Sequence, residues 1–413
     1  MIAPGAATGS EPLPLAGVRV LDLSRLLPGP YASLVLADLG ADVVKVEDRG
    51  GGDYLRWMPP LAGEQSGAFH ALNRNKRSLA LDLKAVGGPA VLKRLAARAD
   101  VLLESFRPGV LDRLGVGWEA LREANPRLVL CSISGFGQEG PYRGLAGHDL
   151  DYCALAGVLA VNGPAERPLP LGVQAADLCG GAWPAVAGIL AALLRRGVTG
   201  LGAHVDIAMT DGVAAMLTMP QAMADARGTP LRREAELLNG GAASYRVYRT
   251  ADGRHVALGA LEPQFFARFC AAAGRPELAE RQFDDDRGAL VAELSALFAT
   301  RTRDQWTRLG HEHDCCLAPV LEGDEPKSDP QLRARGLFVE VETPWEGRAM
   351  PSLATPVRLR GVTAPLRPAP RLGADTDAVL LEAGFSAGEL AALRGAGLVG
   401  AADMASPPPN RLG

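Results

Sequence analysis

The sequence predicts an α/β protein with a doubly wound parallel sheet and a second, smaller α+β region. Two patterns support this prediction. Short apolar runs of strand length alternate with helical stretches in the first third of the chain, and a hairpin followed by helices occupies residues 245–311. The 413 residues are 47% hydrophobic and 22% charged, a composition that can supply the cores of two or three domains.

The first strand is expected at residues 18–23 (VRVLDL), a run of strand length with an alternating apolar pattern. A helix follows at residues 31–39 and ends at Gly40, and residues 43–46 form the second strand. A strand, a helix and a strand within about thirty residues predict a parallel pair with a right-handed crossover.

The same alternation continues, and the composition then changes near residue 226. The most continuous apolar stretch, residues 177–196, predicts a helix that is buried on most sides. The other expected elements are strands at 78–83, 101–104, 128–134, 206–209, 245–248 and 255–259, and helices at 88–97, 211–226, 265–273, 288–299, 303–311 and 387–396.

Charge and composition exclude several classes of function. A net charge of −4 gives no electrostatic basis for binding nucleic acid. The apolar run 180–194 contains Pro184 and is shorter than the ~20 residues that span a bilayer, so no membrane partner is expected. The first residues lack the pattern of a signal peptide and are interpreted as a loose leader. Six scattered cysteines favour reduced thiols and a cytoplasmic location.

Two basic clusters are candidates for binding phosphate. Residues 73–84 (NRNKRSLALDLK) place Lys76 and Arg77 directly before a strand, and residues 104–113 contain Arg107 and Arg113. If the two strands are parallel neighbours, both clusters reach one edge of the sheet and form a polyphosphate clamp. The alternative is a solvated, charged turn. Glu47 follows the second strand, where an acidic ribose ligand would lie, but the missing G-x-G-x-x-G pattern argues against a dinucleotide.

Three acid–base residues stand out, each with a structural alternative. Asp177 begins the long apolar helix and is interpreted first as its N-cap, although Gly180 and Gly181 suggest that a ligand approaches the helix end. His148 lies in Gly-His-Asp, and Glu262 lies where a hairpin strand meets a helix. The HEHDCC run at 311–316 fits no common zinc pattern, so no metal site is expected.

Taken together, these segments resemble the class III CoA-transferase (CaiB/BaiF) family, which includes the α-methylacyl-CoA racemases. The resemblance runs from about residue 15 to 381, with the motifs in the family's order. The matching stretches are LAGVRVLDLSRLLPGPYASLVLADLGADVVKVE, NRNKRSLALDLK, ESFRPGVLDRLG, SISGFGQEGPY, GHDLDY, ADLCGG, YRTADGRHVALGALEPQF, DPQLRARGLF and LGADTDAVL.

The resemblance implies a Rossmann-like large domain built from both ends of the chain, a smaller middle domain and an interlocked homodimer. The boundaries expected on this basis are a leader at 1–14, the large domain at 15–225, the small domain at 226–328 and a return segment at 329–413. It also implies an acyl-CoA thioester substrate and no metal or redox cofactor. The residues expected near the CoA phosphates are Asn75, Lys76, Arg77, Arg107 and Arg113.

The resemblance also narrows the chemistry. In the family's transferases the aspartate at the position of Asp177 becomes acylated and then carries CoA, whereas in the racemases it acts as a base. His148 matches the racemase pattern GHDxNY, and Glu262 matches GAxEPxF. The sequence therefore predicts a racemase that uses His148 and Asp177 as opposed bases, with Glu262 orienting the imidazole.

Two alternatives stay open, which are CoA transfer through a covalent intermediate on Asp177 and CoA binding without turnover. Three departures from the racemase pattern bear on the choice. Asp151 stands where the racemases have asparagine, Asn239 stands where they have aspartate, and Asp48 separates Glu47 from Arg49.

Overall fold

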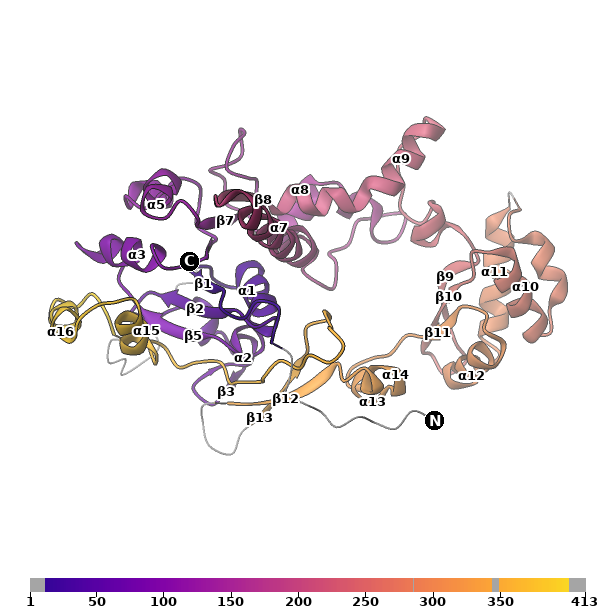
Figure 1. The fold of residues 1–413 in the computed structure, drawn as a ribbon. Helices are drawn as coiled ribbons and strands as arrows, with labels where there is room; N and C mark the ends of the chain where they lie inside the picture. The colour runs from indigo at the N-terminus through magenta and orange to yellow at the C-terminus, as the bar shows by residue number, and fades with distance from the viewer. Residues whose placement is uncertain (1–11, 285, 344–348, 401–413) are drawn as a thin grey trace. The chain divides into compact units, whose positions relative to one another are not determined.

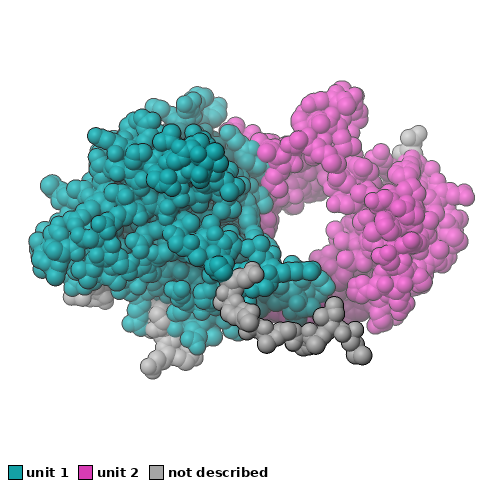
Figure 2. All heavy atoms as spheres, viewed as in Figure 1, with its two compact units in different colours: residues 1–152, 174–213, 331–413 teal, residues 153–173, 214–330 magenta. Residues whose placement is uncertain are grey.

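The structure, a computed structural model, describes residues 12–284, 286–343 and 349–400. The chain divides into two compact units, shown in different colours in Figure 2. Unit 1 comprises residues 1–152, 174–213 and 331–413, and unit 2 comprises residues 153–173 and 214–330. Most of the expected leader at 1–14 lies outside the described residues, and the expected domain boundaries at 225 and 328 stay a prediction.

Unit 1 is built on a six-stranded sheet in which every neighbouring pair is parallel, as the sequence predicts. In spatial order the strands are β5 (Arg77–Ala80), β2 (Asp42–Glu47), β1 (Arg19–Asp22), β6 (Val101–Glu104), β7 (Val129–Ser134) and β8 (Ala203–Ala208). The chain moves from β1 toward β5 and later continues on the other side from β6. The strand order therefore reverses between β1 and β6, the place where open α/β sheets bind ligands at their carboxyl edge.

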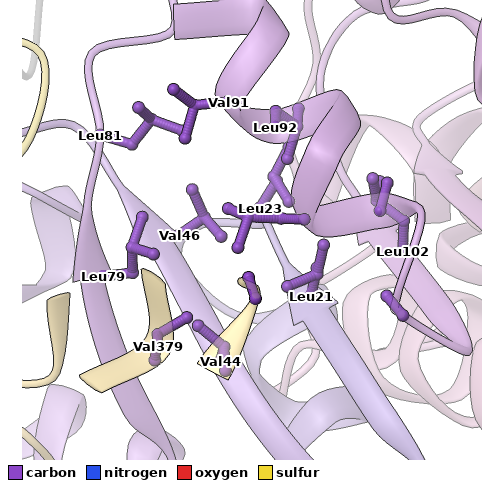
Figure 3. Close-up of a cluster of buried hydrophobic side chains, with 14 of the residues drawn as sticks. Leu21, Leu23, Val44, Val46, Leu79, Leu81, Val91, Leu92, Leu102 and Val379 are labelled. Carbon is purple, nitrogen blue, oxygen red and sulfur yellow. The ribbon is translucent and has the colours of Figure 1, made fainter. Parts of the chain in front are cut away.

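Helices cover both faces of this sheet (Figure 1). Alternate residues of the strands point to one face, where they form a core with α3 (Gly88–Ala96), α5 (Trp118–Ala124), α15 (Thr376–Glu382) and α16 (Ala387–Gly395). In the close-up of Figure 3, Val44 and Leu79 lie beside Val379 of α15. The C-terminal segment is thus part of the core of unit 1. The other face packs against α1 (Pro28–Asp38) and α7 (Trp183–Thr199).

The remaining elements of unit 1 are short helices and two small antiparallel strand pairs. They are η1 (Tyr54–Trp57), the pair β3 (Leu61–Ala62) and β4 (Gln65–Ser66), α2 (Gly67–Asn73), α4 (Val110–Arg113), α6 (Asp149–Leu155), α8 (Met209–Ala214), α14 (Pro330–Ala334), and the antiparallel pair β12 (Phe338–Glu342) and β13 (Ala349–Leu353).

The predicted helix at 177–196 is confirmed, but its first part is a π-helix, η3 (Ala176–Ala182), which continues into α7. By length and composition alone, residues 176–199 could cross a membrane. The core helix of a soluble protein passes the same test, and this stretch packs on β7, β8 and α1. We therefore describe it as part of the α/β fold.

Unit 2 contains the predicted hairpin, β9 (Tyr245–Arg249) and β10 (His255–Gly259), extended by β11 (Leu317–Pro319) on the far side of β10. Its main helices are α10 (Pro263–Ala272), α11 (Arg287–Phe298) and α12 (Arg303–His313). The helix expected at 211–226 is interrupted, because α8 ends at residue 214 and α9 (Thr218–Arg227) begins only after a 3-10 turn, η4 (Ala215–Leu217). Pro220 lacks an N–H group and therefore suits only the first turn of a new helix.

Candidate active site

Asp177 and His148 are held together in unit 1 through the start of α6. The backbone N–H of Asp177 donates to Oδ1 of Asp149, the first residue of α6, at 3.0 Å. His148 directly precedes that helix, and its N–H donates to Oδ2 of Asp151 at 2.9 Å. Asp151 therefore fixes the backbone of His148, a role that the racemase asparagine at this position can also fill with its side-chain oxygen.

The surroundings of Asp177 favour its protonated form more than water does. Burial raises the pKa of its carboxyl group to about 6, and the charge of Asp149 adds to this effect while His148 opposes it. The neighbouring Tyr152 has its pKa raised to about 12, first by burial and then by the charges of Asp177 and Asp151. A carboxyl group that titrates near pH 6 exchanges protons readily at neutral pH, as a general base must.

The two side chains are also free to react. Within the described part of the chain, no residue forms a hydrogen bond with the Asp177 carboxylate or with the His148 imidazole, and His148 is exposed. Tyr152 is occupied, because its hydroxyl donates to the carbonyl oxygen of Gly147 at 2.5 Å. The site thus presents one carboxylate and one imidazole to a substrate.

Two interpretations of the Asp177 region are wrong. Asp177 is not an N-cap, because it lies inside the π-helix and Ala175, which precedes that helix, already has helical backbone angles. The glycines do not open the helix to a ligand either. A Cβ atom at Gly180 would lie 2.4 Å from the carbonyl oxygen of Met209, and one at Gly181 would lie 2.9 Å from the Met209 side chain. The glycines instead let η3 pack closely against α8.

Arg107 and Arg113 lie at the carboxyl edge of the sheet, after β6 and at the end of α4. Both are exposed, and neither has an ion-pair partner among the residues that the structure describes. Arg107 lies close enough to Tyr152 to lower the pKa of its hydroxyl, so it reaches the neighbourhood of Asp177. Guanidinium groups placed at this edge suit the phosphates of an anionic substrate.

The condition for both clusters to share one edge, that their strands are neighbours, is not met. Only the amine of Lys76 reaches the carboxyl end of β1, where it pairs with Asp22, whereas Arg77 lies at the opposite edge. The strands β5 and β6 are not neighbours, and a residue that begins a parallel strand lies at the opposite edge from one that follows a strand. Arg77 begins β5, and its guanidinium pairs with Asp42, the first residue of β2, at 2.7 Å and with Glu382 at 3.0 Å.

Lys76 and Asn75 are likewise engaged with the protein. The Lys76 amine is buried and donates to the carbonyl oxygen of Pro30 at 2.9 Å and to Oδ1 of Asn73 at 2.8 Å. The Asn75 amide donates to Asp38 at 2.7 Å and accepts from the N–H of Arg367 at 2.7 Å. A role for Asn75, Lys76 and Arg77 in binding CoA stays a prediction.

Lys76 belongs to a buried ion cluster at the carboxyl ends of β1 and β2 that the sequence did not reveal. Its six members, each at most 5% exposed, are Asp22, Lys45, Glu47, Asp53, Arg56 and Lys76. The ion pairs are Lys45–Asp53 at 2.9 Å, Arg56–Glu47 at 2.6 Å and Lys76–Asp22 at 3.4 Å. Three acidic and three basic groups balance one another, so the cluster carries no net charge when all six are ionised.

Glu47 is therefore not available to bind a ribose. Both of its oxygens are occupied, since Arg56 binds both, the hydroxyl of Ser78 donates to one and the N–H of Asp53 donates to the other. Burial alone would raise the pKa of Glu47, but Arg56 overcomes this effect and the pKa is lowered to about 2.

The cluster supports the loops around a small cavity of about 40 Å³ at the same edge. The cavity is lined by Arg25, Asp48, the glycines 50–52, Tyr54 and Lys84. Two cations, an aromatic ring and a glycine-rich backbone are the groups that bind the phosphates and base of a nucleotide. Arg25 and Lys84 each follow a predicted strand, so position after a strand was the signal in the sequence that could have identified them.

Glu262 belongs to unit 2, where it directly precedes α10 and is exposed. Its carboxylate does not cap that helix. Its charge reaches Cys316, whose thiol pKa is raised first by burial and then by Glu262. The predicted role of Glu262 in orienting His148 stays a prediction. No group of His, Cys, Asp and Glu side chains suited to a metal ion occurs among the described residues.

A parallel α/β sheet that carries a carboxylate, an imidazole and two arginines near its carboxyl edge defines an enzyme for an anionic substrate. Comparison of the chain with models of known protein families identifies its family. The chain belongs to CoA-transferase family III, whose model matches residues 15–376.

Similar proteins within the family differ in activity. The chain is 39% identical over 381 residues to the α-methylacyl-CoA racemase of Homo sapiens, covering 91% of this chain and 95% of that one. It is 36% identical over 388 residues to the succinate–glutarate CoA-transferase of Agrobacterium fabrum, covering 89% and 95%. A solved CaiB/BaiF family protein from Brucella suis superposes with a TM-score of 0.78 at 32% identity, covering 90% and 100%.

Proposed function

We propose that the protein is an acyl-CoA racemase that moves a proton at the carbon α to a CoA thioester. The observation that carries the proposal is the pair formed by Asp177 and His148, a carboxylate and an imidazole that lie close together and have no hydrogen-bond partner among the described residues. Inversion of a carbon centre by proton transfer needs two such groups, one on each side of the carbon.

In the proposed reaction one group removes the α-proton and the other returns a proton to the opposite face. When ionised Asp177 takes the proton, the electrons of the C–H bond form the enolate of the thioester. Protonated His148 then donates its proton to the carbon and becomes neutral. The reverse direction exchanges the two roles, so the reaction consumes no oxidant, reductant or second substrate. Glu262 sets the tautomer of His148 in this proposal.

The second candidate is CoA transfer between carboxylic acids with Asp177 as the covalent nucleophile. The absence of a described hydrogen-bond partner for the Asp177 carboxylate favours this role as well, because a nucleophilic oxygen must be accessible. The similarity to transferases supports the same candidate. An aspartyl thioester or anhydride reacts with hydroxylamine, so peptide mass spectrometry of the treated enzyme would reveal a hydroxamate at Asp177.

The test of racemisation is deuterium uptake at the α-carbon of 2-methylacyl-CoA in heavy water, without any acceptor acid. We expect uptake by the native enzyme and the loss of inversion in Asp177→Asn and His148→Ala. Matched controls are Asp225→Asn and His311→Ala, which change exposed residues on α9 and α12. Inversion that survives in both active-site variants, or its absence in the native enzyme, would refute the proposal.

The proposal includes a homodimer, as the family resemblance implies. Light scattering coupled to gel filtration measures the mass directly. A single species near twice the chain mass of 43.2 kDa is expected, and a monomer at micromolar concentration would contradict this part of the proposal.

A further inference from the structure

Glu104 is a buried acidic group that the proposed reaction does not use. It is the last residue of β6, pairs in register with Ser132 of β7 and is 5% exposed. Its Oε2 atom accepts a hydrogen bond from the backbone N–H of Phe106 at 2.7 Å, and the Ser132 hydroxyl also bonds to the carboxyl group. Within the described residues, no basic side chain forms an ion pair with Glu104.

The turn held by Glu104, residues 105–109, connects the two parts of the candidate site. On one side, Oγ of Ser105 accepts from the N–H of Arg25 at 3.3 Å, and the Arg25 guanidinium lies 5.9 Å from the centre of the Phe106 ring. Arg25 lines the small cavity described above. On the other side, the same turn carries Arg107 toward Tyr152. A shift of this turn would therefore move Arg107 and the wall of the Arg25 cavity together.

Several titratable groups surround Glu104, and the charged groups that act on its carboxyl group are acidic. Asp112 approaches from α4, Asp206 and His204 from β8, and Cys131 from β7. His204 Nε2 lies 3.0 Å from Oγ of Ser132 and its ring stacks on Trp118 of α5. Burial is the main cause that raises the pKa of Glu104 to about 7. The hydrogen bonds from Ser132 and the Phe106 N–H oppose this rise, and the charges of Asp112 and Asp206 add to it.

We propose that Glu104 is a positioning residue for CoA, whose ionised carboxylate holds the 105–109 turn in the conformation that binds the phosphates. The contact with the Phe106 N–H is the physical basis, because a hydrogen bond to an ionised acceptor is about twice as strong as one to a neutral acceptor. Protonation weakens this contact and frees the turn. The inference requires CoA binding at Arg107 and does not depend on the choice between racemisation and CoA transfer.

The test is the affinity for 3′-dephospho-CoA between pH 6 and pH 8.5, measured by calorimetry. This ligand lacks the phosphate monoester of CoA, whose own titration near pH 6 would obscure the result. The native enzyme is expected to bind about fivefold more tightly at the upper end, the difference between a charged and a neutral hydrogen bond. Glu104→Gln keeps the shape but not the charge, and is expected to bind weakly with no such transition.

Two further variants are expected to shift the midpoint of the pH dependence of ligand affinity in opposite directions. A merely structural role of Glu104 would not produce such opposite shifts. Ser132→Ala removes a donor that favours the ionised form, so the transition is expected at higher pH. Asp206→Asn removes a like charge, so the transition is expected at lower pH. Glu119→Gln, at an exposed ion pair with Arg122 on α5, is the matched control and is expected to keep the native profile.

The possible outcomes distinguish the role of Glu104 from the CoA site and from the proposed reaction. A native profile without a transition, or the same transition in Glu104→Gln, overturns the role of Glu104 and leaves the proposed racemisation untouched. If Glu104→Gln does not fold, midpoints of Ser132→Ala and Asp206→Asn that both equal the native one overturn it instead. Weak binding by the native enzyme at every pH would contradict the CoA site itself, independently of the exchange assay.

Discussion

Breaking the buried ion pair between Glu47 and Arg56 is expected to destabilise unit 1 strongly. Replacement of Glu47 by glutamine leaves the buried Arg56 guanidinium without a counter-charge, and replacement of Arg56 by methionine leaves the carboxylate alone. The pair is 2.6 Å apart, and both side chains are at most 2% exposed. The loss of one partner from a buried pair costs about 3–5 kcal/mol.

The lowered pKa of Glu47 points to an energy of the same order. A folded-state pKa of about 2, against an ordinary value of 4.5, corresponds to about 3 kcal/mol. Because the pKa is lowered on folding, this stability is fully present above pH 4.5 and is lost as the pH falls toward 2. The two routes agree in size, so Glu47→Gln is expected to lower the unfolding free energy by about 3 kcal/mol at pH 7.

The assay is a double-mutant cycle at pH 7, with Glu47→Gln, Arg56→Met and the double variant followed by urea unfolding. A coupling energy of about 2 kcal/mol or more is expected, because the double variant buries no unpaired charge. The matched control is the exposed pair Glu119–Arg122, for which about 0.3–0.5 kcal/mol is typical. A buried-pair coupling no larger than that of the control would refute the reasoning.

Three further predictions concern the site and its supports. Because Asp177 acts as a base only when ionised, the exchange rate of the native enzyme is expected to rise with pH through about 6, and a similar profile in Asp177→Asn would contradict this role. Because folding raises the pKa of Glu104, its contribution to stability is fully present below pH 4.5 and is lost as the pH rises through 7. Glu104→Gln should therefore be more stable than the native protein by up to about 3 kcal/mol at pH 8.5. Thermal unfolding at pH 4.5 should show most of this gain absent. Gly180→Ala is expected to lose about 1–3 kcal/mol through its clash with Met209, whereas Gly197→Ala, which meets no atom within 4 Å, should be neutral or stabilising; equal unfolding free energies would argue against the close packing.

The fold was largely predictable because its strands and helices have strong local patterns. The run VRVLDL contains β1, and the apolar stretch after Asp177 forms a helix as expected. The expectation that this helix is buried on most sides is wrong, because only the face toward the sheet is buried and Leu194 and Val198 are 76% and 89% exposed. Boundaries differ by a few residues where the local signal is weak, as at the start of α1, which includes Pro28 and Gly29. Proline and glycine favour a break between elements, but proline is well tolerated in the first turn of a helix.

Two of the predicted site residues, His148 and Asp177, lie close together in the structure, whereas the sequence did not predict the environments of the others. The motif around His148 and the aspartate at 177 identified groups that the structure brings close together. The sequence could not show that Lys76 is buried beside Asp22, because a cluster of cations before a strand has the same composition whether its members face solvent or one another. Burial of charge depends on contacts between distant segments, which no local pattern encodes.

The glycines after Asp177 have a structural role that differs from the one the sequence suggested. Their position suggests space for a ligand, but Gly180 packs against the backbone of α8, where Gly212 makes the matching approach. This contact fixes the π-helix that contains Asp177. Turns of π-helix are rare overall, but where they occur they are often found at functional sites. The backbone N–H of Asp177 donates to the side chain of Asp149, which lies on another helix, α6. The glycines therefore act on Asp177 indirectly, by letting its helix pack closely against α8.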